Sequence, residues 1–589
     1  MRGLENEEFL FVGTPICRGI AIGRPFFFTL AENKALEVSI DPTNIEDEIV
    51  RYQCAVTKTR EEIKSLHKYL KNERAFDAVA ILDAHLQMME DPLLTTSVET
   101  AIRSTGKNAD YVFQEVIKEY QNKFNSIADP FFRERFKDIQ EIAQRVTCHL
   151  RQNVRECLAD TPHDSIVFAT DLTTFDTAQA NTRYVGAFVT RNGGATSHAA
   201  IVAKAKGIPY VSCIDLEHVM RLKSSIVIVD GRTGTIIFNP SPATLGKYQQ
   251  LKSQLSTHFQ KLKEVGQLEA ETYDGYRIRL SANIETLVDL ETLHQFGGNG
   301  VGLLRTESLF SPGDSFPSEK EQFNLYHQFV KKMQGLPIVI RTFDFGGDKK
   351  FQLQPLEETN PFLGCRAIRL MLKEKDIFKN QLRAILRASA HGDISIMFPM
   401  ISTLSELLEA KAILKETQQE LIAAGEKVAD YIPVGCMIEV PSAAIIADLL
   451  AKECDFFSIG TNDLVQYALA VDRSNNALSD LYRPAHPSII RLIKLVVSEA
   501  NHQGIPVSIC GEVAADPRFT PLLLGLGVHE LSVAPRYLTA IKNAIRNTSV
   551  IEASKLVEKV LTLASSTEIE GLLNREYRLN VPDDCFYNC

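Results

Sequence analysis

The chain has 589 residues, several times the usual length of one domain, so we expect two to four separately packed cores. Apolar residues make up 45% of the sequence and charged residues 23%, which excludes a fibrous or disordered chain and indicates a soluble globular protein. The 64 lysines and arginines are outnumbered by 74 aspartates and glutamates, and the resulting net charge of −10 argues against a general nucleic-acid binder.

The eleven cysteines show no Cys-x-x-Cys pair and no regular spacing, which indicates reduced thiols and a cytoplasmic protein. The N-terminal segment is acidic and contains only a short apolar run, and nowhere do about 18 uninterrupted apolar residues occur. We therefore expect neither a signal peptide nor insertion into a membrane.

The first predicted strand, GIAIGRPFFF at residues 19–28, is separated from the next strands by a long helical region. Four further runs rich in β-branched and aromatic residues follow that region: SIVFAT, RYVGAFVT, PYVSCI and SIVIVDG. If the first strand pairs with these later ones, residues 1–40 and 153–240 form one α/β domain, and residues 41–152 are an insertion in it.

The insertion is predicted to be a helical bundle. From Ile45 and Ile49 onward, apolar side chains recur at spacings of three, four or seven, which is the pattern of one buried helix face. Further amphipathic stretches follow up to residue 152. In one of them His85 shares an apolar face with Met88 and Met89, and this pattern fits a packed core residue and a partner-docking surface equally well.

Apolar residues at helical spacing between Tyr248 and Leu268 predict a linker helix over residues 241–270. From residue 271 to residue 589, eight strand-like runs alternate with helical segments. Such a pattern is typical of a (β/α)8 TIM barrel, whose catalytic groups lie at the C-terminal ends of the strands. Polar residues fall at or just past these ends, namely Asn283, Arg305, Arg341, Glu439, Asn462, Asp463 and Cys510. The fold class is thus a multidomain α/β protein that ends in a TIM barrel.

The segment GGATSHAAIVAKAKG at residues 193–207 is the sharpest local motif. Its paired glycines permit a tight turn, and Thr196 or Ser197 can cap a helix whose first turn contains His198. The free N–H groups of a helix start stabilise a phosphoryl group and disfavour protonation of an imidazole. His198 is therefore a candidate nucleophile, and a capping or packed histidine is the alternative that we weigh against it.

Four arginines lie in loops or at strand ends of the predicted barrel: Arg305, Arg341, Arg366 and Arg473. A guanidinium group binds phosphate or carboxylate through two parallel hydrogen bonds, so four of them on one face indicate a polyanionic substrate. For any one of them, solvation or an ion pair with a neighbouring acid is the alternative. Their shared placement at one face favours the substrate-binding interpretation.

Glu439 and Asp463 each follow an apolar strand, where a buried carboxylate is costly unless it is paired or binds a metal. Magnesium usually takes one or two protein carboxylates, so the two residues fit a Mg²⁺ site, with ion pairs to arginine as the alternative. Cys510 also follows a strand. Its thiol is placed to donate a proton to carbon, although a buried cysteine is more often inert.

Several motifs, in this order along the chain, closely resemble the Enzyme I family, the phosphoenolpyruvate-protein phosphotransferases of the sugar phosphotransferase system. They are GGATSHAAI, GVGLLRTE, RTFDFGGDK, NPFLGCRAIR, MIEVPSAA, DFFSIGTNDLVQYALAVDRSN and CGE. The similarity runs from GTPICRGIAIG near the start to about Asn547. It implies a swivelling phosphohistidine domain with an inserted helical domain that docks a histidine-containing phosphocarrier protein (HPr), then a phosphoenolpyruvate-binding barrel that forms a homodimer.

The resemblance also implies roles for single residues. His198 matches the phosphorylated histidine, and Cys510 matches the acid that protonates enolpyruvate. The phosphoenolpyruvate contacts correspond to Arg305, Arg341, Asn462, Asp463 and Arg473, and the Mg²⁺ ligands to Glu439 and Asp463. Asp171 matches a family aspartate near the histidine, where a carboxylate can orient an imidazole.

The sequence departs from the family at two points, since Thr174-Phe175 stands where relatives often have Pro-Ser, and Cys365 replaces a usual aromatic residue. Neither change removes a proposed catalytic group. Pyruvate phosphate dikinase and phosphoenolpyruvate synthase share the histidine and barrel motifs but need a further nucleotide-binding domain, for which this chain has no room. A phosphorylation-dependent regulatory protein would carry out an identical first transfer, so sugar uptake and regulation both remain open.

Overall fold

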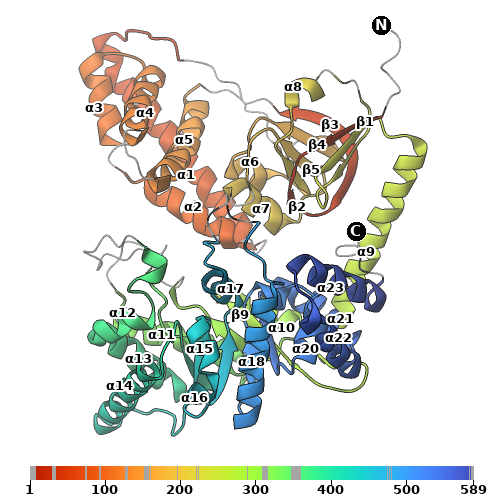
Figure 1. Ribbon diagram of the computed structural model, residues 1–589. Coiled ribbons are helices and arrows are strands. Elements are labelled where there is room, and N and C mark those ends of the chain that lie inside the picture. Colours follow the sequence, from red (N-terminus) through yellow and green to blue (C-terminus); the bar gives the residue numbers. More distant parts are fainter. Residues whose placement is uncertain are drawn as a thin grey trace. The chain divides into compact units, whose positions relative to one another are not determined.

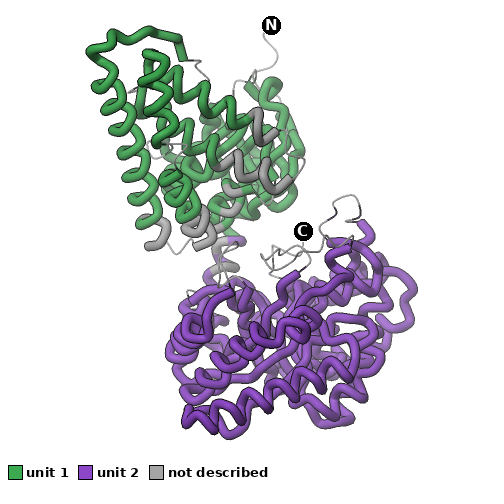
Figure 2. The backbone as a smooth tube through the Cα atoms, turned by 90° about the vertical axis from the view of Figure 1, so that its left-hand side faces the viewer, with its two compact units in different colours: residues 1–254 green, residues 255–589 purple. Residues whose placement is uncertain are grey.

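The structure is a computed structural model, shown in Figure 1. It describes residues 8–28, 35–72, 76–91, 95–125, 130–151, 158, 161–194, 197–220, 222, 224–287, 289–307, 316–346, 360–473, 475, 478, 480–582 and 584. The chain divides into two compact units, residues 1–254 and residues 255–589 (Figure 2). This division falls within one helix, so the domain boundaries expected at residues 40, 152, 240 and 270 stay predictions.

An eight-stranded sheet organises the first unit, with strand order β1-β8-β7-β3-β4-β5-β6-β2. The strands are β1 (Phe9–Val12), β2 (Thr14–Cys17), β3 (Ile20–Phe28), β4 (Ser165–Ala169), β5 (Val185–Thr190), β6 (Tyr210–Ser212), β7 (Val227–Asp230) and β8 (Thr235–Phe238). The long strand β3 changes partner along its length. Residues 20–23 pair antiparallel with β7, whereas residues 24–28 pair parallel with β4.

A glycine makes this change of partner possible. Gly23 stands at the switch, and a Cβ atom there would lie 1.9 Å from the carbonyl oxygen of Asp164, a distance at which no side chain fits. Since β3 pairs with strands that come after residue 160, the helices between β3 and β4 are an insertion, which confirms the predicted class of fold.

The described part of the insertion contains five α-helices: α1 (Ile45–Asn72), α2 (Phe76–Met88), α3 (Thr96–Thr105), α4 (Ala109–Asn125) and α5 (Pro130–Arg151). Their buried apolar side chains, for example Ile49 and Phe113, form one cluster. The cluster also contains Phe175 of α6 (Thr174–Gln179) and Val202 of α7 (His198–Lys206). The bundle core therefore continues into the helices that flank the sheet.

His85 lies inside this core. Its side chain is fully buried, and its ring stacks on that of Phe175 with 5.8 Å between ring centroids and 11° between ring planes. Of the two interpretations of the apolar face of α2, core packing is the one that this residue fits.

The second unit is a closed barrel of eight parallel strands. They are β9 (Arg279–Ile284), β10 (Val301–Leu304), β11 (Ile338–Arg341), β12 (Ile394–Phe398), β13 (Val434–Ile438), β14 (Phe456–Ile459), β15 (Val507–Ile509) and β16 (Glu530–Val533). The last strand pairs with the first, for example through Leu531 and Leu280, which closes the ring. All eight strands lie at the predicted runs, so the predicted TIM barrel is confirmed.

Helix α9 (Pro242–Gly266), which spans the division between the units, is the predicted linker helix. The helices around the barrel are α10 (Asp289–Gln295), α11 (Glu319–Met333), α12 (Ile368–Lys373), α13 (Lys375–Ser389), α14 (Leu404–Ala423), α15 (Pro441–Ile445), α16 (Ala447–Ala451), α17 (Thr461–Leu469), α18 (Pro487–Gln503), α19 (Glu512–Ala515), α20 (Thr520–Gly525), α21 (Leu538–Arg546), α22 (Val550–Thr562) and α23 (Ser566–Asn580). None of the described helices is both long enough and apolar enough to cross a membrane.

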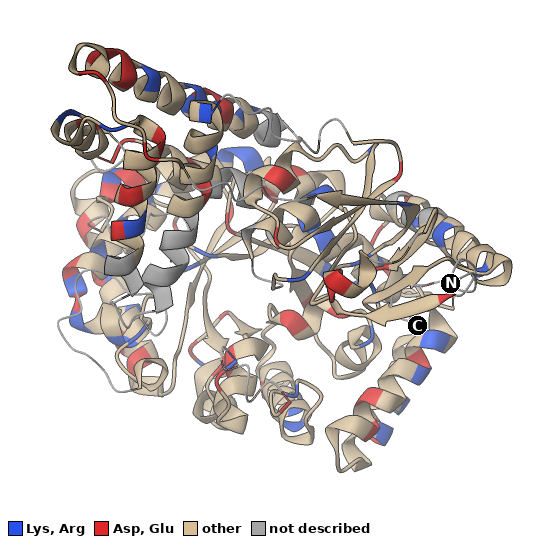
Figure 3. Cartoon of the chain, turned by 90° about the horizontal axis from the view of Figure 1, so that it is seen from above, with Lys and Arg blue, Asp and Glu red and all other residues tan. Residues whose placement is uncertain are grey.

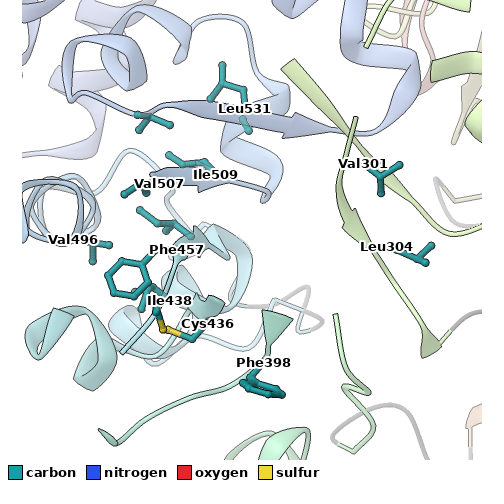
Figure 4. Packing of buried hydrophobic residues seen from close by; sticks show 14 of the residues in the cluster. Val301, Leu304, Phe398, Cys436, Ile438, Phe457, Val496, Val507, Ile509 and Leu531 are labelled. Atoms are coloured by element: carbon teal, nitrogen blue, oxygen red, sulfur yellow. The ribbon is translucent and has the colours of Figure 1, made fainter. Parts of the chain in front are cut away.

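Alternate residues of the barrel strands face two different cores. Cys436 and Ile438 of β13 pack with the surrounding helices in the large cluster of buried residues (Figure 4). Met437, which lies between them, belongs to a small cluster with Leu303, Met397 and Cys510. The outward face of the strands is apolar throughout, whereas the inward face combines this small apolar cluster with polar residues such as Asn283 and Ser532, which are hydrogen-bonded to each other at 2.7 Å.

Acidic and basic residues are interspersed along the helices (Figure 3). Some of them form ion pairs between neighbouring helices. Arg383 and Arg387 of α13 bind the two carboxylate oxygens of Glu319 on α11 at 2.7 and 2.8 Å. These groups are partly exposed, so each pair contributes about 1 kcal/mol or less to stability.

Lys542 of α21 is a buried cation that joins three chain segments. Its side chain is 1% exposed and donates to the carbonyl oxygens of Gly266, Phe296 and Gly297 at 2.8, 3.1 and 2.9 Å. Gly266 ends α9, and the other two residues follow α10. Lys542 therefore fixes the end of the linker helix to the barrel, and its burial lowers the pKa of the ammonium group.

We predict that Lys542→Met lowers the free energy of unfolding by about 2–3 kcal/mol, because one buried and two partly buried carbonyl groups lose their donor. Urea unfolding followed by circular dichroism measures the change. Lys555→Met, at an exposed position on α22, is the matched control and should shift stability by about 0.5 kcal/mol or less. Equal effects of the two substitutions would show that the three contacts do not stabilise the barrel.

Candidate active site

The closed barrel brings the predicted site residues to one rim. Arg305 follows β10, Arg341 ends β11, Glu439 follows β13 and Cys510 follows β15. Asn462 and Asp463 lie in the first turn of α17, directly after β14. Since all strands of the barrel run in the same direction, these positions share its C-terminal face.

Arg341 is buried among acids. Its side chain is 7% exposed, and its Nη2 atom lies 3.2 Å from Oε1 of Glu307 and 3.3 Å from Oδ2 of Asp344. Burial by itself lowers the pKa of the guanidinium, but Glu307 and Asp344 outweigh it and raise the pKa above the ordinary value. Arg341 therefore stays charged inside the protein.

Arg366, which comes from the segment before α12, lies in the same cluster. Both carboxylate oxygens of Asp344 accept hydrogen bonds from its Nη2 atom, at 2.9 and 3.1 Å. Its Nη1 atom donates to Oδ1 of Asp463 at 3.4 Å and to the hydroxyl oxygen of Tyr467 at 3.1 Å. Arg366 thus joins Asp344, which follows β11, to the helix that follows β14.

Glu439 and Asp463 are both buried at this rim. Oε1 of Glu439 accepts a hydrogen bond from the backbone N–H of Met400 at 2.7 Å. Burial raises the pKa of Glu439 to about 8, and the negative charges of Asp463 and Asp344 add to the shift. A Cβ atom at position 460 would lie 2.8 Å from Oε2 of Glu439, so only glycine leaves room for this carboxylate.

The remaining predicted rim residues are more exposed. Arg305 forms an ion pair with Glu285, and Arg473 lies 3.8 Å from Oδ2 of Asp463, with side chains 38% and 36% exposed. Oδ1 of Asn462 accepts from the backbone N–H of Glu512 at 2.8 Å, which ties α17 to the turn after Cys510. Arg305 and Arg473 are therefore partly open to solvent, and Asp463 keeps Arg366 as a partner when Arg473 moves away.

Cys510 is buried at the inner end of this rim, and Sγ lies 3.7 Å from the carbonyl oxygen of Ile459. Burial raises the pKa of the thiol, with smaller opposing effects from Arg341 and Arg305. The side chain of Asn283 donates to the carbonyl oxygen of Cys510 at 2.8 Å and fixes that strand end. The thiol is therefore protonated at neutral pH and held in place.

In the first unit, α7 begins at His198. Ser197 is the N-cap, and its hydroxyl accepts from the backbone N–H of Ala200 at 3.2 Å. The side chain of His198 and the alternative cap Thr196 lie outside the described residues. Asp171 accepts from the N–H of Leu172 at 2.9 Å, and its predicted role in orienting His198 stays a prediction.

Sequence reasoning missed Asp344 and Glu307, which hold the two buried arginines. The signal was present, because each acid lies within three residues of a candidate arginine in a motif at a strand end: Arg341 with Asp344, and Arg305 with Glu307. What the sequence does not show is that Glu307 binds Arg341 and the backbone N–H of Asp344, 34 and 37 residues further along the chain.

Comparison with known proteins gives the class of the chain. Family models of phosphoenolpyruvate-utilising enzymes match at residues 12–135 (N-terminal part), 161–234 (mobile domain) and 259–550 (phosphoenolpyruvate-binding domain). The third match covers the barrel strands and every candidate residue of the rim, and the second contains His198. The chain is thus a phosphoenolpyruvate-utilising enzyme.

Curated relatives narrow this class. A phosphoenolpyruvate-protein phosphotransferase from Listeria innocua is 39% identical over 95% of this chain and 97% of its own length. One from Bacillus subtilis is 39% identical over 92% and 96%. A solution structure of an Enzyme I protein covers 42% of this chain with 31% identity and a TM-score of 0.37. The chain belongs to the family of phosphoenolpyruvate-protein phosphotransferases.

We predict that Asp344→Asn lowers the free energy of unfolding by about 3–5 kcal/mol, because two buried guanidinium groups lose their shared carboxylate. Asp430→Asn, at an exposed loop position before β13, is the control and should cost about 0.5 kcal/mol or less. Urea unfolding of both variants measures the difference. A stability loss no larger than that of the control would contradict the importance that we assign to Asp344.

Proposed function

We propose that His198 takes the phosphoryl group from phosphoenolpyruvate and passes it to HPr, with release of pyruvate, as the first step of the sugar phosphotransferase system. Membership of the family supports this class of reaction. The observation that carries the proposal is the pair of buried guanidinium groups, Arg341 and Arg366, that Asp344 holds together at the rim of the barrel. Such a pair suits a substrate with a phosphate and a carboxylate.

The arginines proposed to bind the substrate are of two kinds: some are fixed by carboxylates, and others can exchange their ion-pair partners. Arg341 and Arg366 are held by carboxylates, so they are already oriented when the substrate arrives. Arg305 and Arg473 lie at the exposed part of the rim in weak ion pairs, which they can give up for the substrate's phosphate and carboxylate. Positive charge around the phosphoryl group lowers the repulsion that an incoming nucleophile meets.

The residues at the rim fit a divalent cation, and we propose Mg²⁺ bound by Glu439 and Asp463. Four buried carboxylates, those of Glu307, Asp344, Glu439 and Asp463, share the site with two buried guanidinium groups, which leaves two negative charges without compensation when all are ionised. The pKa of Glu439 is raised chiefly by burial, and the charges of Asp463 and Asp344 add to the shift.

Within the described part of the chain, no three acidic, histidine or cysteine side chains form a metal-binding group. The proposed ion therefore rests on these two carboxylates, with substrate and water as further ligands, as is usual for magnesium. When bound, it supplies positive charge that stabilises the transferring phosphoryl group.

Cys510 is the proposed proton donor. Its buried thiol is protonated at neutral pH because burial raises its pKa. When the phosphoryl group leaves, enolpyruvate needs a proton on carbon to become pyruvate, and a thiol at the inner end of the rim can supply it.

His198 lies in the other unit of the chain, at a helix start whose free N–H groups stabilise a bound phosphoryl group. The unit that carries it has to reorient between the barrel and the carrier. In the same proposal, the helical insertion docks HPr, the barrel forms a homodimer and the protein acts in the cytoplasm. The eight described cysteines form no disulfide with one another, which fits a reducing compartment.

We predict that radiolabelled phosphoenolpyruvate with Mg²⁺ labels the protein on His198, since that residue alone among the histidines begins a helix preceded by the Gly-Gly turn. His198→Ala should remove the label completely. His502→Ala, at an exposed position of α18, is the matched control and should leave labelling unchanged. Label that persists in His198→Ala would overturn the assignment.

We predict opposite kinetic effects for two substitutions in the barrel. Cys510→Ala should lower turnover for pyruvate formation by about 100-fold or more with little change in KM, because a general acid is lost. Arg341→Ala should raise KM by about tenfold or more as well as slow the reaction, because a charge-assisted contact to the substrate is lost. Steady-state kinetics of both variants test this. Normal turnover in Cys510→Ala would make the thiol a packing residue.

A further inference from the structure

Behind the rim, the second unit contains a cavity of about 690 Å³ that is widely open to solvent and that the reaction described above does not use. Its walls come from the start of α15, the end of α17, the first three turns of α18 and the residue Ala564 after α22. Helices α15, α17 and α18 lie side by side around it (Figure 1). A volume of this size accommodates a small organic molecule.

The lining of the cavity is mostly apolar with positive charge on one side. Leu492 and Leu495 of α18 provide apolar surface, and Arg491 and His486 provide the basic groups, while none of the described residues that line the cavity is acidic. Arg491 is held at the edge because its Nη2 atom donates to the carbonyl oxygen of Leu561 at 3.3 Å. A ligand with an apolar body and a carboxylate complements this surface.

One residue of the cavity wall also contacts the candidate active site. The hydroxyl of Tyr467 donates to the carbonyl oxygen of Phe362 at 2.6 Å and accepts from Nη1 of Arg366 at 3.1 Å. The same Nη1 atom contacts Asp463, which lies four residues before Tyr467 on α17 and so shares its helix face. Tyr467 therefore links the cavity to the guanidinium group that binds Asp344.

A second segment makes the same connection. Pro441, which lines the cavity, follows the candidate metal ligand Glu439 by only two residues. The two segments that carry Glu439 and Asp463 thus form the rim on one side and the cavity wall on the other. A ligand in the cavity fixes both segments and Arg366 with them.

We propose that this cavity is a regulatory site for a small carboxylate with an apolar body, and that its occupancy increases the affinity of the barrel for phosphoenolpyruvate. A ligand against Tyr467 holds the arrangement in which its hydroxyl positions Arg366. Occupancy then adds to the orientation that Asp344 already gives Arg366, so the two ligands favour each other's binding. The inference rests on the proposed function for its effect on substrate, but ligand binding itself does not depend on it.

Binding is tested on the full chain with octanoate and 4-phenylbutyrate as probes and 1-octanol as an uncharged analogue. Calorimetry should show saturable binding of at least one carboxylate and none of the alcohol. Arg491→Gln should abolish that binding and leave the basal kinetics unchanged. Arg483→Gln, a nearby exposed arginine outside the cavity, should bind as the natural chain does. Failure of both carboxylates to bind, or equal binding to Arg491→Gln, would overturn the proposed site.

The coupling between the cavity and the substrate site is tested by measuring pyruvate formation with and without the probe. The KM for phosphoenolpyruvate should fall about fivefold when the probe is saturating. Tyr467→Phe keeps the ring but loses the hydroxyl, so it should bind the probe and show no change of KM when the probe is added. An unchanged or raised KM in the natural chain overturns the coupling. If the chain forms no pyruvate even without probe, the proposed function fails, whereas calorimetry still decides the site.

Discussion

The hydrogen bonds between Arg366 and both carboxylate oxygens of Asp344 are the interaction on which the rim of the barrel depends. Asp344 also pairs with Arg341, so one carboxylate is shared by two buried guanidinium groups, with Glu307 and Asp463 as their further acidic partners. A buried charge is costly unless it is paired and hydrogen-bonded. The closed ring of strands makes this pairing possible, because it brings together charged residues from strands that lie far apart in the sequence.

In the proposed function, the positive and negative charges of this network balance only when the ligands are bound. The carboxylates outnumber the guanidinium groups inside the rim, and burial together with the charges of Asp463 and Asp344 raises the pKa of Glu439 to about 8. The proposed cation restores the balance. The substrate's negative charge then meets the buried pair Arg341 and Arg366 as well as the more exposed Arg305 and Arg473.

Much of this architecture could be predicted from the sequence. The eight apolar runs gave the strands, and the strand ends gave Arg341, Glu439, Asp463 and Cys510, because a parallel barrel brings all those ends to one rim. The insertion could be predicted because one strand-like run precedes the helical region and four such runs follow it. The continuity of the bundle core with α6 and α7, through Phe175 and Val202, was not predictable, because it depends on packing between segments that share no local pattern.

The residues that escaped prediction have their partners in other motifs. Asp344 lies in RTFDFGGDK, but it binds Arg366 of NPFLGCRAIR, which in turn contacts Asp463 of GTNDL. Tyr467 and Lys542 are similar, since each contacts atoms far away in the chain. A motif read alone shows a charged or polar residue and no reason for it. The role of such a residue becomes clear only in the folded chain, where another motif provides the opposite charge or the carbonyl group that it binds. For this reason the long motifs of this chain act together as parts of one site.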